Sequence, residues 1–450
     1  MNKNQLLGFL TIALLTATVP VQLCAQSLIS SPPLLSTTQQ IVPALAWKYG
    51  PNDGKLANTI GSAANHNPLP AGTTYLSAGY IPSQIAHAYG FDKVATNGDG
   101  RGVVIAIVDA YGSPNIQSDL NKFDSQYGLT QTTIKILYPD GMPTNNDSGW
   151  AGETTLDVEW AHAMAPGATI YLVVAPNSGH LYNTVNYIAN TKGFLPSNSI
   201  ISMSWGGLEF TNEKSFDGCF TNPSLSFVAA SGDYPTTNYP AASPFVLGVG
   251  GTTMIYDTTN NIIISETGWN GSLDTNGFGP GYGGGGGISQ YETLPSYQAR
   301  YNANSGRGIP DVVYDADPYT GFAVYFTDPT TTNAGTWSIY GGTSAGAPQW
   351  AALQARRVSL INTPHPGTLA PTYSNLLPYI YITLGYTVYP VGPFKTPPNT
   401  SYTGYTTLIR DIILGNNGVW PATTAYDLAT GLGSPVANNF AIPSGTSNGL

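Results

Sequence analysis

The sequence predicts an α/β fold built on an open, doubly wound and mostly parallel sheet. Two observations support this prediction: five runs rich in Val, Ile and Leu are almost continuously apolar, and segments with helical spacing separate several of them. Near-continuous apolar runs are typical of parallel strands that are buried on both faces. Helices between such strands are the crossover connections that a parallel sheet needs.

The elements follow one another from about residue 80. The predicted strands are residues 102–110, 169–176, 199–207, 225–233 and 245–253. The predicted helices are residues 114–124, 152–164 and 182–191. In an open α/β sheet a ligand binds beyond the carboxyl ends of the strands. We therefore expect the strand ends "VDAYG", "SWGG" and "ASGD" to line one crevice.

The first 25 residues have the pattern of a secretory signal peptide, with an apolar stretch and a small residue, Ala25, at the cleavage position. A single membrane anchor is the alternative, but Pro20 and several Thr residues interrupt the stretch, which is short for a span. We expect a secreted protein without membrane attachment after cleavage. Residues 26–79 are rich in Ser, Thr, Pro, Asn and Gly and predict an extension or linker before a domain at residues 80–445.

The chain is poor in charged residues. Asp, Glu, Lys and Arg make up only 9 % of the 450 residues, against about 25 % in an average protein. A fold with few carboxylate ion pairs loses less stability in acid, so this composition is compatible with work at low pH. The net charge of −10 and the absence of a basic run exclude nucleic acid as an expected partner. We expect a monomer with one cysteine, Cys219, once the signal peptide is removed.

The stretch "GGTSAGAPQWAAL" (341–353) places Ser344 between a glycine-rich turn and a predicted helix. Free backbone N–H groups and the helix dipole at such a position stabilise an alkoxide or an oxyanion. Serine is also a common helix N-cap, so this motif alone favours a cap. The five histidines of the chain lack an obvious serine-protease motif, so a base for Ser344 must be sought among other residues.

Two carboxyl groups four residues apart, Glu153 and Asp157, offer such a base. On a helix they lie on one face, about 40° apart. Carboxyl groups this close share a proton, which provides a base and a group that orients it. The alternative is a solvated acidic face near a helix N-terminus. Glu159 lies about 240° from Glu153 and is expected to be an exposed charge.

Asp233 lies at the end of a predicted buried strand, in a turn that should line the crevice. A protonated carboxyl group there could donate a hydrogen bond to an oxyanion. The alternative is an Asp that only forms the turn. The nearby glycine run, residues 279–289, lacks the Gly-Lys-Ser/Thr ending of a phosphate loop. We expect a close-approach or mobile loop instead.

Together these stretches resemble the sedolisin-type serine-carboxyl peptidases, a family with a subtilisin-like fold. The family pattern is Glu-x-x-x-Asp, Asp after a Ser-Gly or Ala-Gly strand end, and Gly-Thr-Ser-x-x-x-Pro, matched here in order from about residue 80 to 440. The resemblance implies a peptidase that hydrolyses polypeptide substrates, at acid pH. By this resemblance, Ser344 is the nucleophile, Glu153 the general base, Asp157 the partner that orients Glu153, and Asp233 the protonated oxyanion donor.

The resemblance also implies one structural calcium ion. Its ligands would be the carboxylates of Asp411 and Asp427 and the backbone carbonyls of Ile412, Thr423 and Ala425. Hard oxygen ligands of this kind suit calcium. Where relatives have Gly-x-Gly-x-Asp, this chain has "TTAYD" at residues 423–427. Residues 377–407 look like an insertion that precedes the calcium site. Many sedolisins carry a large N-terminal propeptide domain, for which only about 50 residues are present here, so we expect self-processing to be short or absent.

Two alternatives stay open. One is a subtilisin-type triad of Asp109, His162 and Ser344, although His162 lies about 180° from Glu153 around the predicted helix. That triad predicts activity near neutral pH, and a carboxylate base predicts activity in acid. The other alternative is an inactive secreted binding protein on the same fold, against which the retention of all four catalytic residues argues.

Overall fold

The computed structural model describes residues 79–271, 281–362, 377, 380–381 and 408–440, together with the backbone of residues 42–43. The predicted signal peptide and most of the extension and of the predicted insertion lie outside the described residues, so these assignments stay predictions. Within the described ranges, every helix is too short or too polar to span a bilayer.

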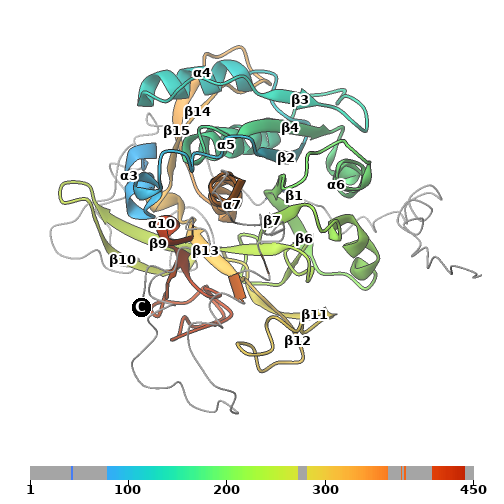
Figure 1. Ribbon diagram of the computed structural model, residues 1–450, viewed down its shortest axis with the longest axis vertical. Helices are drawn as coiled ribbons and strands as arrows, with labels where there is room; N and C mark the ends of the chain where they lie inside the picture. The colour runs from blue at the N-terminus through green and yellow to red at the C-terminus, as the bar shows by residue number, and fades with distance from the viewer. Residues whose placement is uncertain are drawn as a thin grey trace, which may run out of the picture.

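The fold is organised around a sheet in the order β10-β9-β7-β5-β2-β4-β3, with β13 also paired to β9 (Figure 1). Its strands are β2 (Val104–Ala110), β3 (Lys135–Leu137), β4 (Thr169–Ala175), β5 (Ile200–Met203), β7 (Ser226–Ala230), β9 (Leu247–Asp257), β10 (Ile262–Gly268) and β13 (Val312–Asp315). All pairs are parallel except that of β9 with β10. The predicted α/β class with a mostly parallel sheet is confirmed.

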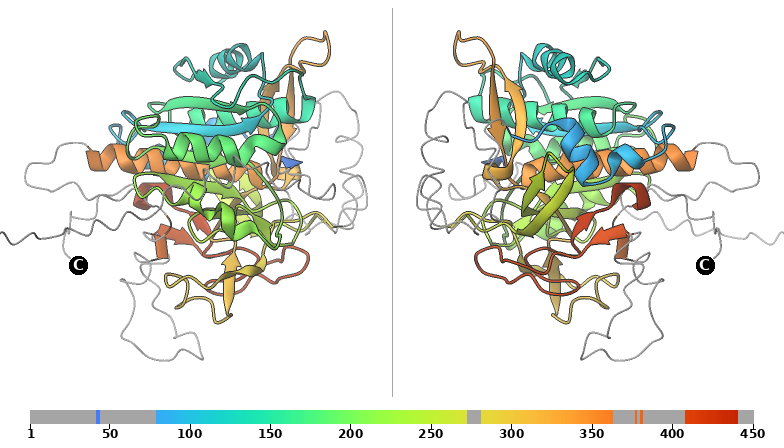
Figure 2. Two further views of the ribbon diagram at one scale, coloured as in Figure 1. Left: turned by 90° about the vertical axis from the view of Figure 1, so that its right-hand side faces the viewer. Right: turned by 90° about the vertical axis from the view of Figure 1, so that its left-hand side faces the viewer.

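Helices cover both faces of the sheet. They are α4 (Ile116–Tyr127), α5 (Ser148–Met164), α6 (Leu181–Asn190) and α7 (Gly346–Asn362). Alternate residues of β2 separate into two apolar clusters: Ile105 packs with side chains of α4, α5 and α7, and Ala106 packs with side chains of α6. Figure 2 shows α7, in orange, lying along one side of the blue and green strands. Burial on both faces explains why these strands are apolar throughout.

The remaining elements are shorter. They are β1 (Val42–Pro43), α3 (Pro82–Ala88), β6 (Trp205–Leu208), β8 (Asn238–Tyr239), β11 (Gly287–Thr293), β12 (Gly306–Ile309), β14 (Phe322–Phe326), β15 (Thr336–Tyr340), β16 (Ile409–Arg410), β17 (Ser434–Pro435) and α10 (Ala437–Phe440). The predicted strand 199–207 divides at Ser204, because β5 stays in the main sheet and β6 leaves it to pair with β8. Strands β3, β10 and β13 were not predicted.

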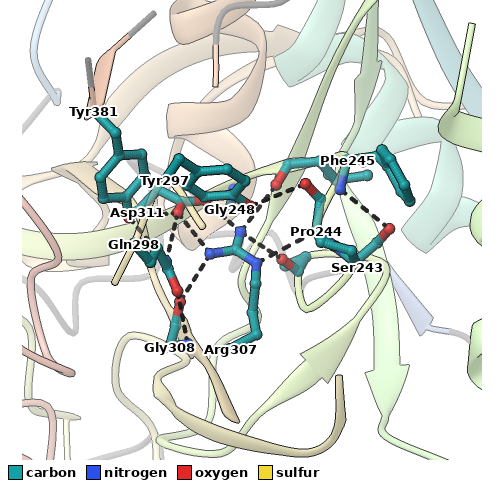
Figure 3. Close-up of polar contacts among 12 residues, drawn as sticks. Ser243, Pro244, Phe245, Gly248, Tyr297, Gln298, Arg307, Gly308, Asp311 and Tyr381 are labelled. Atoms are coloured by element: carbon teal, nitrogen blue, oxygen red, sulfur yellow. Dashed lines mark hydrogen bonds and ion pairs between the residues drawn. The ribbon is translucent and has the colours of Figure 1, made fainter. Parts of the chain in front are cut away.

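A buried ion pair fixes the segment between β12 and β13 (Figure 3). Arg307 and Asp311 are fully buried, and their side chains meet through Nη2–Oδ2 at 2.6 Å and Nη1–Oδ1 at 2.7 Å. Asp311 Oδ1 also accepts hydrogen bonds from Tyr381 Oη at 2.7 Å and Gln298 Nε2 at 3.1 Å, and Oδ2 accepts one from Gly248 N at 2.7 Å. The pair is therefore fully satisfied, which a buried ion pair requires.

The prediction that Glu159 is an exposed charge is wrong. Its side chain is fully buried between α5 and the hairpin of β14 and β15, and Oε2 accepts a hydrogen bond from Tyr325 N at 3.2 Å. Burial raises the pKa of Glu159 well above its usual range. Asp119 and Asp124 on α4 are also buried close to it, and the two negative charges raise the pKa of Glu159 further.

Because the buried carboxyl groups of Glu159 and Asp124 have raised pKa values, we expect the free energy of unfolding to decrease as the pH rises from about 4 to about 8. Burial raises the pKa of Asp124 from 3.8 to about 7. Between these values the folded protein holds a proton that the unfolded chain has lost, so the stabilisation is complete below the lower value and is lost above the upper one. Urea unfolding across this pH range measures the decrease. This pH-dependent decrease should be smaller in the Asp124→Asn variant. An equal decrease in the variant and in the unmodified protein would contradict this role of Asp124.

Candidate active site

Ser344 lies where β15 turns into α7. Gly342 has φ +97°, in the region that favours glycine, and a short 3₁₀ turn, Thr343–Ala345, leads into α7 at Gly346. Ser344 is buried within that turn. The structure thus places the hydroxyl at a helix N-terminus, where the helix dipole favours negative charge.

The α5 helix brings Glu153 to Ser344. Both side chains are fully buried. Burial and the neighbouring charge of Asp157 raise the pKa of Glu153 well above its usual range, and the nearby Ser344 hydroxyl acts in the opposite direction. Both carboxyl oxygens of Glu153 are buried without a hydrogen-bond partner among the described residues. The nearby hydroxyl favours the ionised form of Glu153, the form that can accept a proton.

Asp157 lies one helical turn after Glu153 and is also fully buried. Its Oδ1 accepts a hydrogen bond from Ser204 Oγ at 2.9 Å. A third carboxyl group, that of Asp109 at the end of β2, is close enough to raise the pKa of both Glu153 and Asp157. Burial raises the pKa of Asp109 itself to about 7. These carboxyl groups therefore influence one another's protonation.

His162 faces a different part of the molecule. Its Nε2 lies 2.9 Å from the Thr130 carbonyl oxygen and 3.5 Å from Asp124 Oδ1, on the side of α5 that packs against α4. Burial lowers the pKa of His162. The structure therefore brings Asp109 to the carboxyl groups of α5, and not to His162 as the alternative triad requires.

Asp233 lies beside the residue that precedes the nucleophile candidate. Its Oδ1 accepts hydrogen bonds from Thr343 N at 2.8 Å and Thr343 Oγ1 at 2.9 Å. Its Oδ2 is buried and has no hydrogen-bond partner among the described residues. Burial raises the pKa of Asp233 to about 7. In acid the carboxyl group is therefore neutral, and its free oxygen can carry a proton and donate it in a hydrogen bond.

The glycine run packs against this loop at close approach. The backbone N–H groups of residues 283–286 donate hydrogen bonds to the carbonyl oxygens of Asp233, Trp269, Gly232 and Thr236, at 2.7–3.2 Å. A side chain at Gly283, Gly285 or Gly286 would collide with a backbone carbonyl oxygen of a neighbouring segment. The close-approach interpretation fits these contacts, and the run fixes the backbone around Asp233.

The residues predicted to bind calcium lie together in one loop region. Asp411 Oδ2 accepts a hydrogen bond from Ala425 N at 2.9 Å, and Asp427 Oδ2 accepts one from Thr423 N at 2.7 Å. The Thr430 hydroxyl contacts both Asp427 and the Ile412 carbonyl oxygen. Ala425 has φ +66°, so it adopts the left-handed conformation of the glycine that it replaces in the family pattern.

The Asp411–Asp427 pair has features that suit a cation. Burial and the nearby charge of Asp427 raise the pKa of Asp411 to about 6. Asp411 Oδ1 is buried without a hydrogen-bond partner in the described part of the chain. Two adjacent carboxylates with an unused oxygen are a suitable donor set for a hard divalent ion.

A segment from the N-terminal region occupies the edge of β6. Backbone residues Val42 and Pro43 form β1, which pairs with β6 in antiparallel orientation, opposite Gly206 and Trp205 (Figure 1). The same two residues also lie against α5. Ser204, the partner of Asp157, immediately precedes β6. This edge therefore accepts an extended polypeptide next to the carboxyl groups.

Comparison with known proteins identifies the family. Residues 141–374, just over half of the chain, match the model of the subtilase family. The chain belongs to the subtilase family. As expected from the sequence, the known relatives of this subtilase include sedolisin-type peptidases.

The subtilase is 32 % identical to kumamolisin of Bacillus sp. (strain MN-32) over 394 residues, covering 79 % of this chain and 62 % of that protein. It is 27 % identical to sedolisin of Pseudomonas sp. (strain 101) over 408 residues, covering 83 % of this chain and 62 % of that protein. The chain therefore spans somewhat less than two thirds of the length of these relatives.

The subtilase is also similar in fold to the solved structure of Pseudomonas sedolisin, described as a serine-carboxyl proteinase complexed with two molecules of pseudo-iodotyrostatin. The TM-score is 0.64 at 23 % identity, with 82 % of this chain and 98 % of that chain covered. The predicted subtilisin-like fold is confirmed.

Sequence reasoning assigned no catalytic role to Ser204 or Thr343, and it gave Asp109 a catalytic role only in the alternative triad with His162 and Ser344. All three are close to the carboxyl groups of the subtilase site: Ser204 contacts Asp157, and Thr343 contacts Asp233. Their positions at strand ends and turns were visible in the sequence. Their partners were not, because each contact joins residues far apart in the chain.

Proposed function

We propose that this chain is a serine-carboxyl peptidase that cleaves polypeptides in acid. One observation carries the proposal. The turn that carries Ser344 packs against α5, which carries the buried Glu153 carboxyl, and the adjacent residue Thr343 holds Asp233 with one carboxyl oxygen free. A nucleophile, a base and a donor for an oxyanion are thus provided by three segments of the fold.

In this mechanism the Ser344 oxygen attacks the carbonyl carbon of the substrate, and its proton passes to Glu153. The carbonyl electron pair moves onto oxygen, and the protonated Asp233 donates a hydrogen bond to the resulting oxyanion. When the C–N bond breaks, the proton on Glu153 goes to the leaving amine. Water then attacks the acyl group, gives a proton to Glu153, and releases the acid as the proton returns to Ser344. Asp157 shares a proton with Glu153 and orients it.

The edge of β6 supports a polypeptide as substrate. The chain's own residues 42–43 already pair with it as an antiparallel strand. Main-chain hydrogen bonds to a sheet edge bind an extended peptide irrespective of its sequence. We infer that a substrate pairs with the same edge, and that β1 leaves this edge before a substrate binds.

The test of this proposal is the pH dependence of peptide hydrolysis. The reaction needs a protonated Asp233, whose pKa is about 7, so we expect kcat to fall above this pH. Asp233→Asn retains an N–H donor that does not titrate. We expect this variant to have a lower kcat than the unmodified protein in acid, and its kcat should not fall at higher pH. Ser344→Ala is the control for contaminating peptidases. Equal hydrolysis by Ser344→Ala and the unmodified protein would contradict the proposal.

We also propose that Asp411, Asp427 and the carbonyls of Ile412, Thr423 and Ala425 bind one calcium ion. When bound, the ion neutralises the two carboxylates, and the chain's own contribution is to hold these oxygens together. An ion bound only by the folded state stabilises it. We therefore expect a chelator to lower the melting temperature, and Asp411→Asn to remove the effect of added calcium. Identical melting curves with and without the chelator would contradict this site.

The organisation of the chain is part of the same proposal. We propose that residues 1–25 direct secretion, that residues 26–79 form an extension, and that residues 80–445 form a monomeric peptidase domain. Mass spectrometry of protein secreted by an expressing cell would locate the N-terminus. A mature chain that still begins at Met1 would contradict cleavage after Ala25.

A further inference from the structure

We propose that the carboxyl groups of Glu209, Glu213 and Glu292 form a pH-sensitive clamp, which holds β11 against the end of β6 in acid and releases it above neutral pH. None of these three residues belongs to the proposed catalytic machinery. The inference therefore goes beyond the proposed function, and it does not depend on whether the protein hydrolyses peptides.

Three segments bring the carboxyl groups together. Glu209 directly follows β6, Glu213 begins the 3₁₀ helix η4 (Glu213–Phe220), and Glu292 lies on β11. The η4 helix packs against β11. Glu213 is fully buried, and Glu292 is only 3 % exposed. The cluster is thus an interface between segments that are far apart in the chain.

The ladder between β11 and β12 does not hold the middle of β11. Its register shifts between Ile288 and Thr293, so the residues between these two form a bulge. Within the bulge, the backbone N–H groups of Tyr291 and Glu292 donate hydrogen bonds to Ser289 Oγ, at 3.2 Å and 2.7 Å. The bulge is therefore held by its own side chains and by contacts outside the ladder.

Glu209 supplies the outside contacts. Its Oε1 accepts a hydrogen bond from the Ser289 hydroxyl, and its Oε2 accepts one from Gln290 N at 3.1 Å. One carboxyl group thus holds two adjacent residues of the bulge. β11 follows directly after the glycines 283–286, which fix the backbone around Asp233. The bulge is therefore continuous with the loop of the candidate active site.

The two buried carboxyl groups beside Glu209 have oxygens without a donor. Glu213 Oε2 accepts a hydrogen bond from Phe210 N at 2.8 Å, but Glu213 Oε1 and Glu292 Oε1 have no hydrogen-bond partner among the described residues. The charge of Glu209 acts on both groups. Neutral carboxyl groups pack together without repulsion. Ionised groups repel one another, and a buried charge without a donor is costly.

The raised pKa values of the two buried groups set the pH of release. Burial raises the pKa of Glu213 from 4.5 to about 9, and the charge of Glu209 adds to this shift. Burial and the charge of Asp217 raise the pKa of Glu292 from 4.5 to about 7. The closed clamp holds protons that the released, hydrated groups lose. Its stability is therefore complete below about pH 4.5 and is lost as the pH rises through about 7 and 9.

The other groups around the cluster do not prevent this release. Lys214 on η4 and Arg307 on β12 lower the pKa of Glu292, but burial and the negative charges outweigh them. Lys214 is exposed, and Arg307 is held in the buried ion pair described above. Tyr182 on α6 lies close to Glu213, and burial raises the pKa of Tyr182 well above its usual range, so this ring stays neutral.

Hydrogen–deuterium exchange of the full-length Ser344→Ala variant tests the clamp, because this variant lacks the proposed nucleophile and so should not digest itself. The exchange of residues 287–293 is compared at about pH 5 and about pH 8, after correction for the intrinsic pH dependence of amide exchange. We expect the protection of this segment to fall at least about tenfold at the higher pH. Residues 104–110 of β2 are the internal reference and should stay protected, since they open only when the sheet unfolds.

Glu213→Gln and Glu292→Gln, each added to Ser344→Ala, remove one titrating proton from the cluster. We expect each variant to keep more protection of residues 287–293 at pH 8 than Ser344→Ala alone. Glu159→Gln is the matched control, because Glu159 is equally buried but contacts β14. This control should leave the pH-dependent release of residues 287–293 unchanged.

Equal protection of residues 287–293 at the two pH values would overturn the clamp. Equal losses in this segment and in β2 would also overturn it, since they indicate unfolding of the whole domain. This comparison needs no carboxyl variant, so it decides the question even if one such variant fails to fold. Unchanged release in folded Glu213→Gln and Glu292→Gln would contradict the role of these groups. Absence of peptide hydrolysis by the unmodified protein would contradict the proposed function and not the clamp.

Discussion

Replacing Glu153 with Gln is expected to lower kcat by about 10²- to 10⁴-fold, the contribution of a positioned general base. The amide has nearly the same shape as the carboxyl group and can fill the same position near Ser344. It cannot accept the Ser344 proton when the bond to the substrate carbon forms. The fold should be retained, because burial raises the pKa of Glu153 and so favours its neutral form, and a neutral amide in its place introduces no unpaired charge.

The matched control is Glu159→Gln, the same substitution six residues further along α5. Glu159 is equally buried but hydrogen-bonds to Tyr325 on β14, on another side of the helix. We expect this variant to keep the kcat of the unmodified protein. Both variants should have the far-UV circular dichroism of the unmodified protein at the assay pH. An unchanged kcat in folded Glu153→Gln would refute the assignment of the base.

Replacing Arg307 with Met should lower the free energy of unfolding by about 3–5 kcal/mol, which is the usual effect of leaving one member of a buried ion pair without its partner. Arg307 and Asp311 are fully buried and joined by two hydrogen bonds. Without the guanidinium, the Asp311 carboxylate loses the one counter-ion that it has among the described residues. Its contacts to Gln298, Gly248 and Tyr381 remain, but they do not neutralise the charge.

Urea unfolding provides the measurement. Arg101→Met is the control, because Arg101 pairs with Asp99 at the surface and should leave the unfolding midpoint unchanged. The double variant Arg307→Met with Asp311→Leu removes both charges, so we expect it to regain part of the lost stability. If Arg307→Met unfolded at the same urea concentration as Arg101→Met, the ion pair would have no structural role.

The sequence predicted the central strands well, because each is buried on both faces and is therefore apolar along its whole length. β2 illustrates this: every residue from Val104 to Ala110 is buried. Strand β3 has only three residues, all partly or fully exposed, and strand β10 is mostly half-exposed. Neither has the apolar run or the regular alternation that sequence patterns can recognise.

The carboxyl pair was also predictable, since Glu153 and Asp157 are one turn apart on the same helix. The error at Glu159 has a physical cause. Helical spacing gave the direction of its side chain, but only the tertiary fold determines whether that direction leads to solvent or to another element. Here it leads to the hairpin of β14 and β15, which lies more than 150 residues further along the chain.

The glycine run has a consequence for how the sequence of this loop can vary. Its backbone touches three other segments so closely that a single Cβ atom cannot be inserted at Gly283, Gly285 or Gly286. A single substitution at one of these glycines therefore requires the opposing backbone segment to move at the same time. Variation in this loop must instead accumulate at the flanking positions, such as Tyr282, where the backbone leaves room for a side chain.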